Sequence, residues 1–182
     1  MISNVGDDRP ADRSLTAQRL DLSVFLDNWH GVAATLIDRH LTIVSSTPLG
    51  AALFPTMHPG SNVVREVFLG WETGNRAICA EDASGQVIAA LQALIAIDDE
   101  DDEFRRIVGE LSTLSRRFST AWAHGAEPLH PSGHLRTEHP EIGEISLTYQ
   151  LLSLANKPHD VLIVWQARDD RSDSALQRLV SR

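Results

Sequence analysis

The chain has 182 residues, of which 42% are hydrophobic, enough for one domain with a substantial core. It carries 16 basic and 25 acidic residues, and Lys157 is its one lysine, so the net charge of -9 argues against a nucleic-acid-binding surface. Its lone cysteine, Cys79, excludes an intramolecular disulfide, and no stretch resembles a signal peptide or a membrane span. We therefore expect a cytoplasmic protein that neither crosses a membrane nor binds nucleic acid directly.

The N-terminal part of the chain predicts a disordered lead followed by a helix and a hairpin. Residues 1–20 are polar, so the folded domain is expected to be a single one spanning 21–182. Apolar residues at helical spacing predict a first helix; they are Leu22, Phe25, Leu26 and Trp29. Residues 32–37 and 41–45 predict two strands joined by a turn at 38–40.

Helical patterns fill the middle of the chain. Pro48 suits the first turn of a short helix over 49–54, and Asn62 is placed to cap a second short helix. A long helical pattern covers residues 82–97. Two further helices have apolar faces at helical spacing, formed by Phe104, Ile107, Val108 and Leu111 and then by Leu114, Phe118 and Trp122.

The clearest strand pattern lies near the C-terminus. Every second residue is apolar on one face of the first strand, at Ile145, Leu147, Tyr149 and Leu151. The alternation slips at 151–152, as it does at a β-bulge. Residues 161–165 are apolar without alternation, which is typical of a central strand covered on both faces. Between these strands, residues 156–160 have the composition of a turn.

The remaining patterns complete the fold. Residues 125–133 predict a loop before a strand near Leu135, and Gly143 is expected to take a positive φ or to allow a close backbone approach in the turn before the long strand. Ser172 is expected to cap a final helix whose apolar side is formed by Leu176, Leu179 and Val180. Two early and three late strands with helices between them predict an α+β domain, an antiparallel sheet of about five strands flanked by helices.

The sequence lacks the patterns of common enzyme and metal sites. There is no nucleophile elbow, phosphate-binding loop, dinucleotide fingerprint or H-E-x-x-H pattern, and the eight histidines lack metal-ligand spacing. Residues 98–103 are six consecutive acids, but they have neither the glycine nor the alternating ligands of a calcium loop. They are better explained as the negatively charged first turn of the next helix. We expect no enzymatic activity and no cofactor.

Three polar residues have two interpretations each. Asn62 either satisfies only the first amide groups of its helix or also contacts a ligand. Arg65, one turn into that helix, either pairs with an acid or binds an anionic ligand. His139 either hydrogen-bonds a backbone carbonyl and fixes its turn or contacts the polar head of a ligand. The sequence leaves these alternatives open.

Several segments in the same order resemble one known family. The first hairpin, 36–44 with Thr47-Pro48-Leu49, resembles the start of a PAS-type sensor domain. The rest resembles the MmyB-like transcription-regulator ligand-binding domain in residues 62–69, Leu91, Val108-Gly109-Glu110-Leu111, Ser115, Phe118, Trp122, 139–147 and 172–179. The similarity covers nearly all of residues 24–182. The ordered set is specific to the family, although no single segment is.

This resemblance implies a PAS-like fold and a sensing function. Members of the family are regulators, many of them from actinobacteria, that are linked to secondary metabolism and are thought to sense a fatty-acid-like ligand. We expect the ligand-binding residues to be three polar anchors and three apolar wall residues, namely Asn62, Arg65 and His139 with Ile145, Leu147 and Tyr149. The alternative is a protein-interaction module that pairs with itself as a homodimer or with a helix-turn-helix partner.

The sequence also departs from the family. Thr47, Ala80 and Gln92 stand where the family usually has Asn, Trp and Arg, which predicts a pocket altered in size and charge. Family members usually carry an N-terminal helix-turn-helix domain, which needs several helices. About twenty polar residues precede Leu22, so we expect the sensor half without its own DNA-binding domain.

Overall fold

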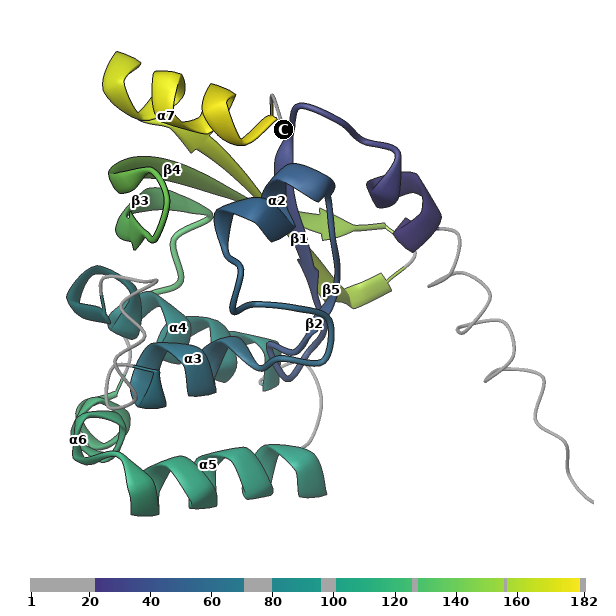
Figure 1. The fold of residues 1–182 in the computed structure, drawn as a ribbon. Coiled ribbons are helices and arrows are strands. Elements are labelled where there is room, and N and C mark those ends of the chain that lie inside the picture. The colour runs from purple at the N-terminus through teal and green to yellow at the C-terminus, as the bar shows by residue number, and fades with distance from the viewer. Residues whose placement is uncertain (1–21, 71–79, 96–100, 126–127, 156, 181–182) are drawn as a thin grey trace, which may run out of the picture.

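The computed structural model describes residues 22–70, 80–95, 101–125, 128–155 and 157–180 (Figure 1). The predicted lead, Cys79 and acids 98–100 lie outside these residues. After a short helix at 22–27, the elements in chain order are β1 (Ala33–Ile37), β2 (Ile43–Ser46), α2 (Pro48–Leu53), α3 (Val63–Leu69), α4 (Ala80–Ile95), α5 (Asp102–Leu114), α6 (Arg116–His124), β3 (Ser132–His139), β4 (Gly143–Leu154), β5 (Lys157–Ala167) and α7 (Asp170–Val180).

The five strands form one antiparallel sheet in the order β2-β1-β5-β4-β3. The sheet joins the early hairpin to the late one, because β5 pairs with both β1 and β4. Helices flank the sheet, and Figure 1 shows α3 to α6 together on one side of it. The α+β architecture predicted from the sequence is therefore confirmed.

The central strand β5 is covered on both faces, as its unbroken apolar run predicted. Val161 and Ile163 belong to the larger core, which lies between the sheet and helices α2 to α7. Leu162 and Val164 belong to a smaller core on the opposite face, where the short helix at 22–27 contributes Leu26. The face shared with the larger core is called the inner face below.

The β4–β5 hairpin differs from the prediction in two details. Leu154 pairs with Lys157, so the connection is only two residues long and 157–160 belong to β5 rather than to a turn. Pro158 is tolerated because it lies at the start of the strand, beside the irregular end of the ladder. The register shifts between Ser153 and Leu154, two residues after the expected bulge.

The β3–β4 hairpin confirms the predicted turn at Gly143. Gly143 has φ +75, and it pairs with His139 across a three-residue connection. A residue in the left-handed region after three-residue turns is the usual arrangement of such hairpins. The strand β3 begins at Ser132, earlier than the sequence pattern around Leu135 indicated.

Side-chain caps begin several helices. Asn62 Oδ1 accepts hydrogen bonds from Val64 N and Arg65 N, at 3.1 and 3.3 Å, and so caps α3 as predicted. Asp101 Oδ1 accepts from Phe104 N at 2.8 Å as the N-cap of α5, and Asp102 and Glu103 lie in the first turn as predicted.

The starts of α2 and α7 are also joined to the sheet by side-chain hydrogen bonds. Thr47 Oγ1 accepts from Gly50 N at 3.1 Å and donates to Val32 O at 2.6 Å, which joins α2 to the start of the sheet. The predicted cap at Ser172 was wrong, because Asp169 Oδ1 accepts from Ser172 N at 2.7 Å instead. Ser172 lies inside the first turn, where its Oγ accepts from Ser146 N at 2.9 Å and joins α7 to β4.

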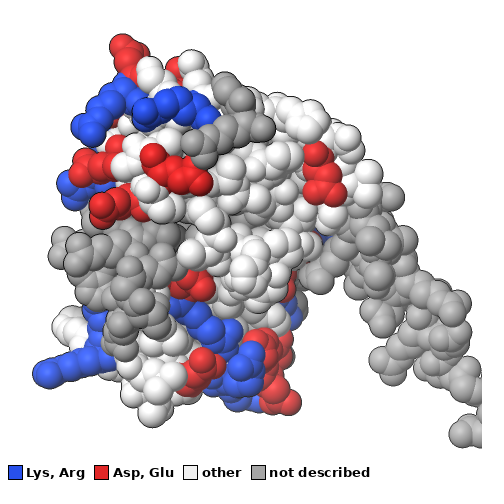
Figure 2. Space-filling model, viewed as in Figure 1, with Lys and Arg blue, Asp and Glu red and all other residues white. Residues whose placement is uncertain are grey.

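Charged side chains of both signs are mixed on the surface. In the view of Figure 2 they gather over α7 and over α5, with a band of uncharged residues between them. On α5, Arg106 pairs with Glu103 and Glu110, and Arg105 pairs with Asp102. These pairs on one helix face spread the charge over α5 and leave no block of a single sign there.

Candidate functional site

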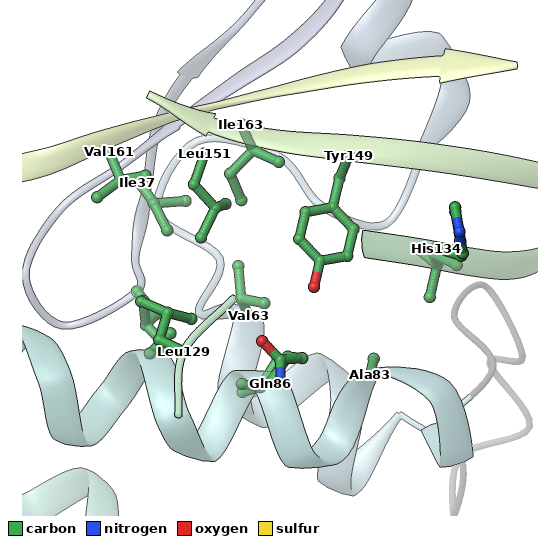
Figure 3. A pocket seen from close by; sticks show the side chains of 14 residues that line it. Ile37, Val63, Ala83, Gln86, Leu129, His134, Tyr149, Leu151, Val161 and Ile163 are labelled. Atoms are coloured by element: carbon green, nitrogen blue, oxygen red, sulfur yellow. The ribbon is translucent and has the colours of Figure 1, made fainter. Parts of the chain in front are cut away.

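A cavity of about 110 Å³ lies between the inner face of the sheet and helix α4 (Figure 3). Its lining is apolar apart from a few side chains. The lining residues are Ile37, Leu41, Val63, Ala83, Gln86, Val87, Ala90, Leu129, His134, Leu135, Tyr149, Leu151, Val161 and Ile163. Protein interiors have few voids larger than a water molecule, so a cavity of this size is a candidate ligand site.

Strand alternation and helical spacing place the two walls. Tyr149 and Leu151 are two residues apart on β4, and Val161 and Ile163 are two apart on β5, so all four side chains share the inner face. On the opposite wall, Ala83, Gln86, Val87 and Ala90 recur every three or four residues and so form one face of α4. Because Ala83 and Ala90 have small side chains, this face of α4 leaves space between the helix and the sheet.

Two polar side chains point into the cavity region. Figure 3 shows the Tyr149 ring extending from the sheet toward α4, with its hydroxyl on the side where Gln86 lies. Gln86 Oε1 accepts a hydrogen bond from His130 N at 2.9 Å, which joins α4 to the segment before β3. Burial raises the pKa of the Tyr149 hydroxyl above its usual value, so this group is protonated at neutral pH. His134 lies at the edge on β3 and is exposed.

The Tyr149 ring lies over a glycine. Gly133 pairs with Tyr149 across the β3–β4 ladder, and a Cβ added to Gly133 would lie 2.5 Å from the Tyr149 hydroxyl oxygen. The ring also contacts Trp165 on β5, with 6.0 Å between the ring centroids. Gly133 and Trp165 therefore hold Tyr149 from two sides and fix its direction into the cavity.

The predicted wall residues fall into two groups. Tyr149 lines the cavity, whereas Ile145 and Leu147 do not, although all three lie on the same face of β4. Ile145 and Leu147 are 1% and 0% exposed and belong to the solid part of the core. Their assignment as ligand-binding residues stays a prediction.

The three predicted polar anchors lie outside the cavity lining, and each has a partner within the chain. The Asn62 side chain caps α3 and donates to His40 O at 2.7 Å. Arg65 binds Glu110 through three N–H···O contacts of 2.7 to 3.3 Å. His139 is buried, with its Nε2 2.8 Å from Ala52 O. Their role toward a ligand also stays a prediction.

Ion pairs join helix α5 to the rest of the domain beside these residues. Asp101 Oδ2 lies 2.8 Å from His40 Nε2 and 3.7 Å from Arg39 Nη2. His40 and Arg39 belong to the turn between β1 and β2. The pKa of Asp101 is lowered mainly by the hydrogen bond from Phe104 N, and that of Glu110 mainly by the one from Arg65. Both carboxylates are therefore held ionised where α5 meets the sheet and α3.

Sequence reasoning missed the α4 wall of the site. The spacing of apolar residues predicts a helix over 82–97, but it does not indicate that one face of this helix borders a cavity. The available signal is two small residues, Ala83 and Ala90, at helical spacing with one polar residue, Gln86. Gln92, one of the departures from the family, lies on α4 but does not line the cavity.

A comparison with protein families identifies the domain. The model of the MmyB-like transcription regulator ligand binding domain matches residues 19–179. This chain belongs to that family. The match confirms the resemblance to the MmyB-like domain that was predicted from segments between residues 36 and 179.

Comparisons with solved structures give two matches of low sequence identity. The PAS domain of an HTR-like protein from Haloarcula marismortui is 12% identical, with a TM-score of 0.40, and the match covers 86% of this chain and 97% of that one. The LOV protein of Rhodobacter sphaeroides is 14% identical, with a TM-score of 0.43, and the match covers 91% and 81% of the two chains. No curated protein matched the sequence.

Two searches within the described residues concern other classes of site. Among the parts of the chain that the structure describes, no helix is long and apolar enough to cross a membrane. In the same residues, no group of three or more His, Cys, Asp or Glu side chains is arranged to hold a metal ion.

Proposed function

We propose that this MmyB-like domain acts in the cytoplasm as the ligand-sensing part of a transcription regulator and holds its ligand in the cavity between the sheet and α4. The finer part of the proposal is that the ligand is fatty-acid-like, with an apolar portion and one polar end. The observation that carries the proposal is the apolar cavity in a member of a ligand-binding family. The polar end would lie near Tyr149 and Gln86.

The size of the cavity supports an apolar occupant. Its volume of about 110 Å³ is of the same order as the roughly 150 Å³ engineered cavity, in another protein, that stays dry and binds benzene. It is smaller than the roughly 300–1,000 Å³ of pockets that enclose drug-sized ligands. A compact group or the end of a chain fits the cavity as it stands, and a longer chain requires part of the ligand to extend beyond it.

Filling the cavity tests this function. Ala90→Phe places a ring where the ligand would lie, whereas Ala123→Phe adds the same ring to an exposed position on α6. Native mass spectrometry of the three purified proteins should show a bound small molecule on the wild type and on Ala123→Phe, and none on Ala90→Phe.

The contrary result is equally clear. Equal occupancy of Ala90→Phe and the wild type would place the ligand elsewhere. A wild type that carries no small molecule, and whose cavity methyl groups show no NMR shift with an apolar probe, would contradict sensing at this cavity. Concentration-dependent association of such an empty protein would support the protein-interaction alternative.

A further inference from the structure

We infer that the ligand group held in the cavity is an uncharged hydrogen-bond acceptor, the carbonyl of a ketone, ester or amide, rather than an ionised carboxylate. This inference rests on the proposed function and narrows its ligand class. Three observations carry it: the absence of charge in the described lining, the engagement of Arg65 elsewhere, and the two donors that the cavity offers.

The first observation is the charge of the walls. Among the residues that the structure describes, the cavity lining contains no Asp, Glu, Lys or Arg. Its titratable members are Tyr149 and the exposed His134 at the edge. An ionised carboxylate placed between Leu151, Ile163 and α4 would lose its hydration without a charged partner, which is among the most unfavourable changes a buried group undergoes. A neutral carbonyl avoids this cost.

The second observation is the state of Arg65, the predicted partner for an acid. Its Nε and Nη2 both contact the Glu110 carboxylate, in the bidentate geometry that is favoured between these groups. To bind a ligand acid, Arg65 would have to leave Glu110, which would keep only the 3.6 Å contact with Arg106. Arg65 is also absent from the lining. The Arg65 guanidinium therefore joins α3 to α5.

The third observation is the kind of polar group in the cavity. The Gln86 carbonyl oxygen already accepts from His130 N and keeps one lone pair, whereas both N–H groups of its amide nitrogen can donate to a ligand. The Tyr149 hydroxyl is the other candidate, and neither group forms a hydrogen bond with another residue in the described part of the chain. Both side chains line the cavity, and their donors match an acceptor with two lone pairs, which a carbonyl oxygen supplies.

Three probes of seven heavy atoms test the inference. They share one branched alkyl group and differ at the other end: 4-methyl-2-pentanone offers a neutral carbonyl, 3-methylbutanoate a carboxylate, and 2,4-dimethylpentane neither. Each is titrated at pH 7 into methyl-labelled protein, and binding is followed by the NMR shifts of the cavity methyl groups of Ile37, Val63, Leu151 and Ile163. The ketone should bind at least about tenfold more tightly than the carboxylate.

Variants then assign the donors. Tyr149→Phe keeps the ring and removes the hydroxyl, so it should weaken the ketone about fivefold and leave the alkane unchanged. Gln86→Met keeps the length of the side chain and removes the amide, and it should act on the ketone in the same direction. Because the alkane binds without a polar contact, it reports any general loosening of the cavity in either variant.

Each other outcome has a definite meaning. Binding of the carboxylate as tight as that of the ketone, weakened by Arg65→Ala, would overturn the inference and leave the sensing function intact. A ketone affinity unchanged in both Tyr149→Phe and Gln86→Met would also overturn it. Failure of all three probes to shift the cavity methyl groups would instead contradict the proposed function itself.

Discussion

One face of strand β4 has two halves that are covered in different ways. Ile145 and Leu147 form what we call the packed half. Here α7 lies against β4, and the Ser172 hydroxyl of α7 accepts a hydrogen bond from the β4 backbone. Tyr149 and Leu151 form the cavity half, which faces α4. The same strand, with the same alternation, is thus filled solidly at one end and leaves space at the other.

The difference shows that alternation alone does not locate a binding site. Alternation determines which side chains face inward, whereas the element opposite determines whether the volume is filled. In the packed half, Leu176 of α7 belongs to the same solid core. In the cavity half, Ala83 and Ala90 of α4 leave room that larger residues would occupy.

The largest expected effect on the free energy of unfolding comes from truncating a core leucine, and its size should differ between the two halves. Leu147→Ala removes a fully buried side chain from the packed half and should lower the free energy of unfolding by about 3 kcal/mol. Leu151→Ala removes a partly exposed side chain that already borders a cavity, so about 1 kcal/mol is expected. Urea denaturation monitored by circular dichroism measures both losses.

A second outcome distinguishes the halves further. Leu151→Ala enlarges the cavity and should change the affinity of an apolar probe, whereas Leu147→Ala should leave that affinity unchanged in the folded protein. Equal destabilisation by the two substitutions would show that the halves are equally packed.

The turn at the packed end gives the next effect. Gly143→Val places a β-branched residue at φ +75 and should cost about 2 kcal/mol of stability. Its added carbon meets no atom within 4 Å, so backbone strain is the cause rather than a clash. Gly109→Ala, in the open interior of α5, is the matched control and should raise stability by roughly 0.5–1 kcal/mol. A Gly143 variant as stable as the wild type would contradict the strained turn.

The glycine of the cavity end should affect binding more than folding. Gly133→Ala puts a Cβ where the Tyr149 ring now lies, so the ring must turn away or the strands must shift. We expect a loss of about 1 kcal/mol in the free energy of unfolding and a clear drop in ketone affinity. A Gly133→Ala protein that binds the ketone like the wild type would show that the direction of Tyr149 does not matter.

The smallest effect lies outside both halves, at the Arg65–Glu110 pair. Because its folded-state pKa is lowered, Glu110 stabilises the fold above its unfolded pKa of about 4.3 and loses this contribution as the pH falls through the folded value. Glu110→Gln should therefore cost about 0.5–1 kcal/mol at pH 7 and progressively less below pH 4. Thermal unfolding from pH 7 to pH 3 measures it, and a pH-independent difference between the proteins would contradict the assignment.

Local chemistry explains which predictions from the sequence succeeded. The central strand, the cap at Asn62 and the positive φ of Gly143 each depend on a few neighbouring residues, and all three are confirmed. The cap of α7 was misplaced by three residues because Asp169 and Ser172 are both good caps, and only the fold brings Ser172 to β4. The α4 wall depends on which helix crosses which half of β4. The small alanines and Gln86 can be seen in the sequence, but no local pattern places them opposite Tyr149 and Leu151.

The hydrogen bond between Gln86 and His130 links the α4 wall of the cavity to the backbone segment before β3. One side-chain amide lines the cavity and also accepts the backbone N–H of a residue 44 positions away, just before edge strand β3. A ligand that orders the Gln86 amide also stabilises this acceptor for His130. The exchange rate of the His130 backbone N–H should therefore fall when the cavity is occupied.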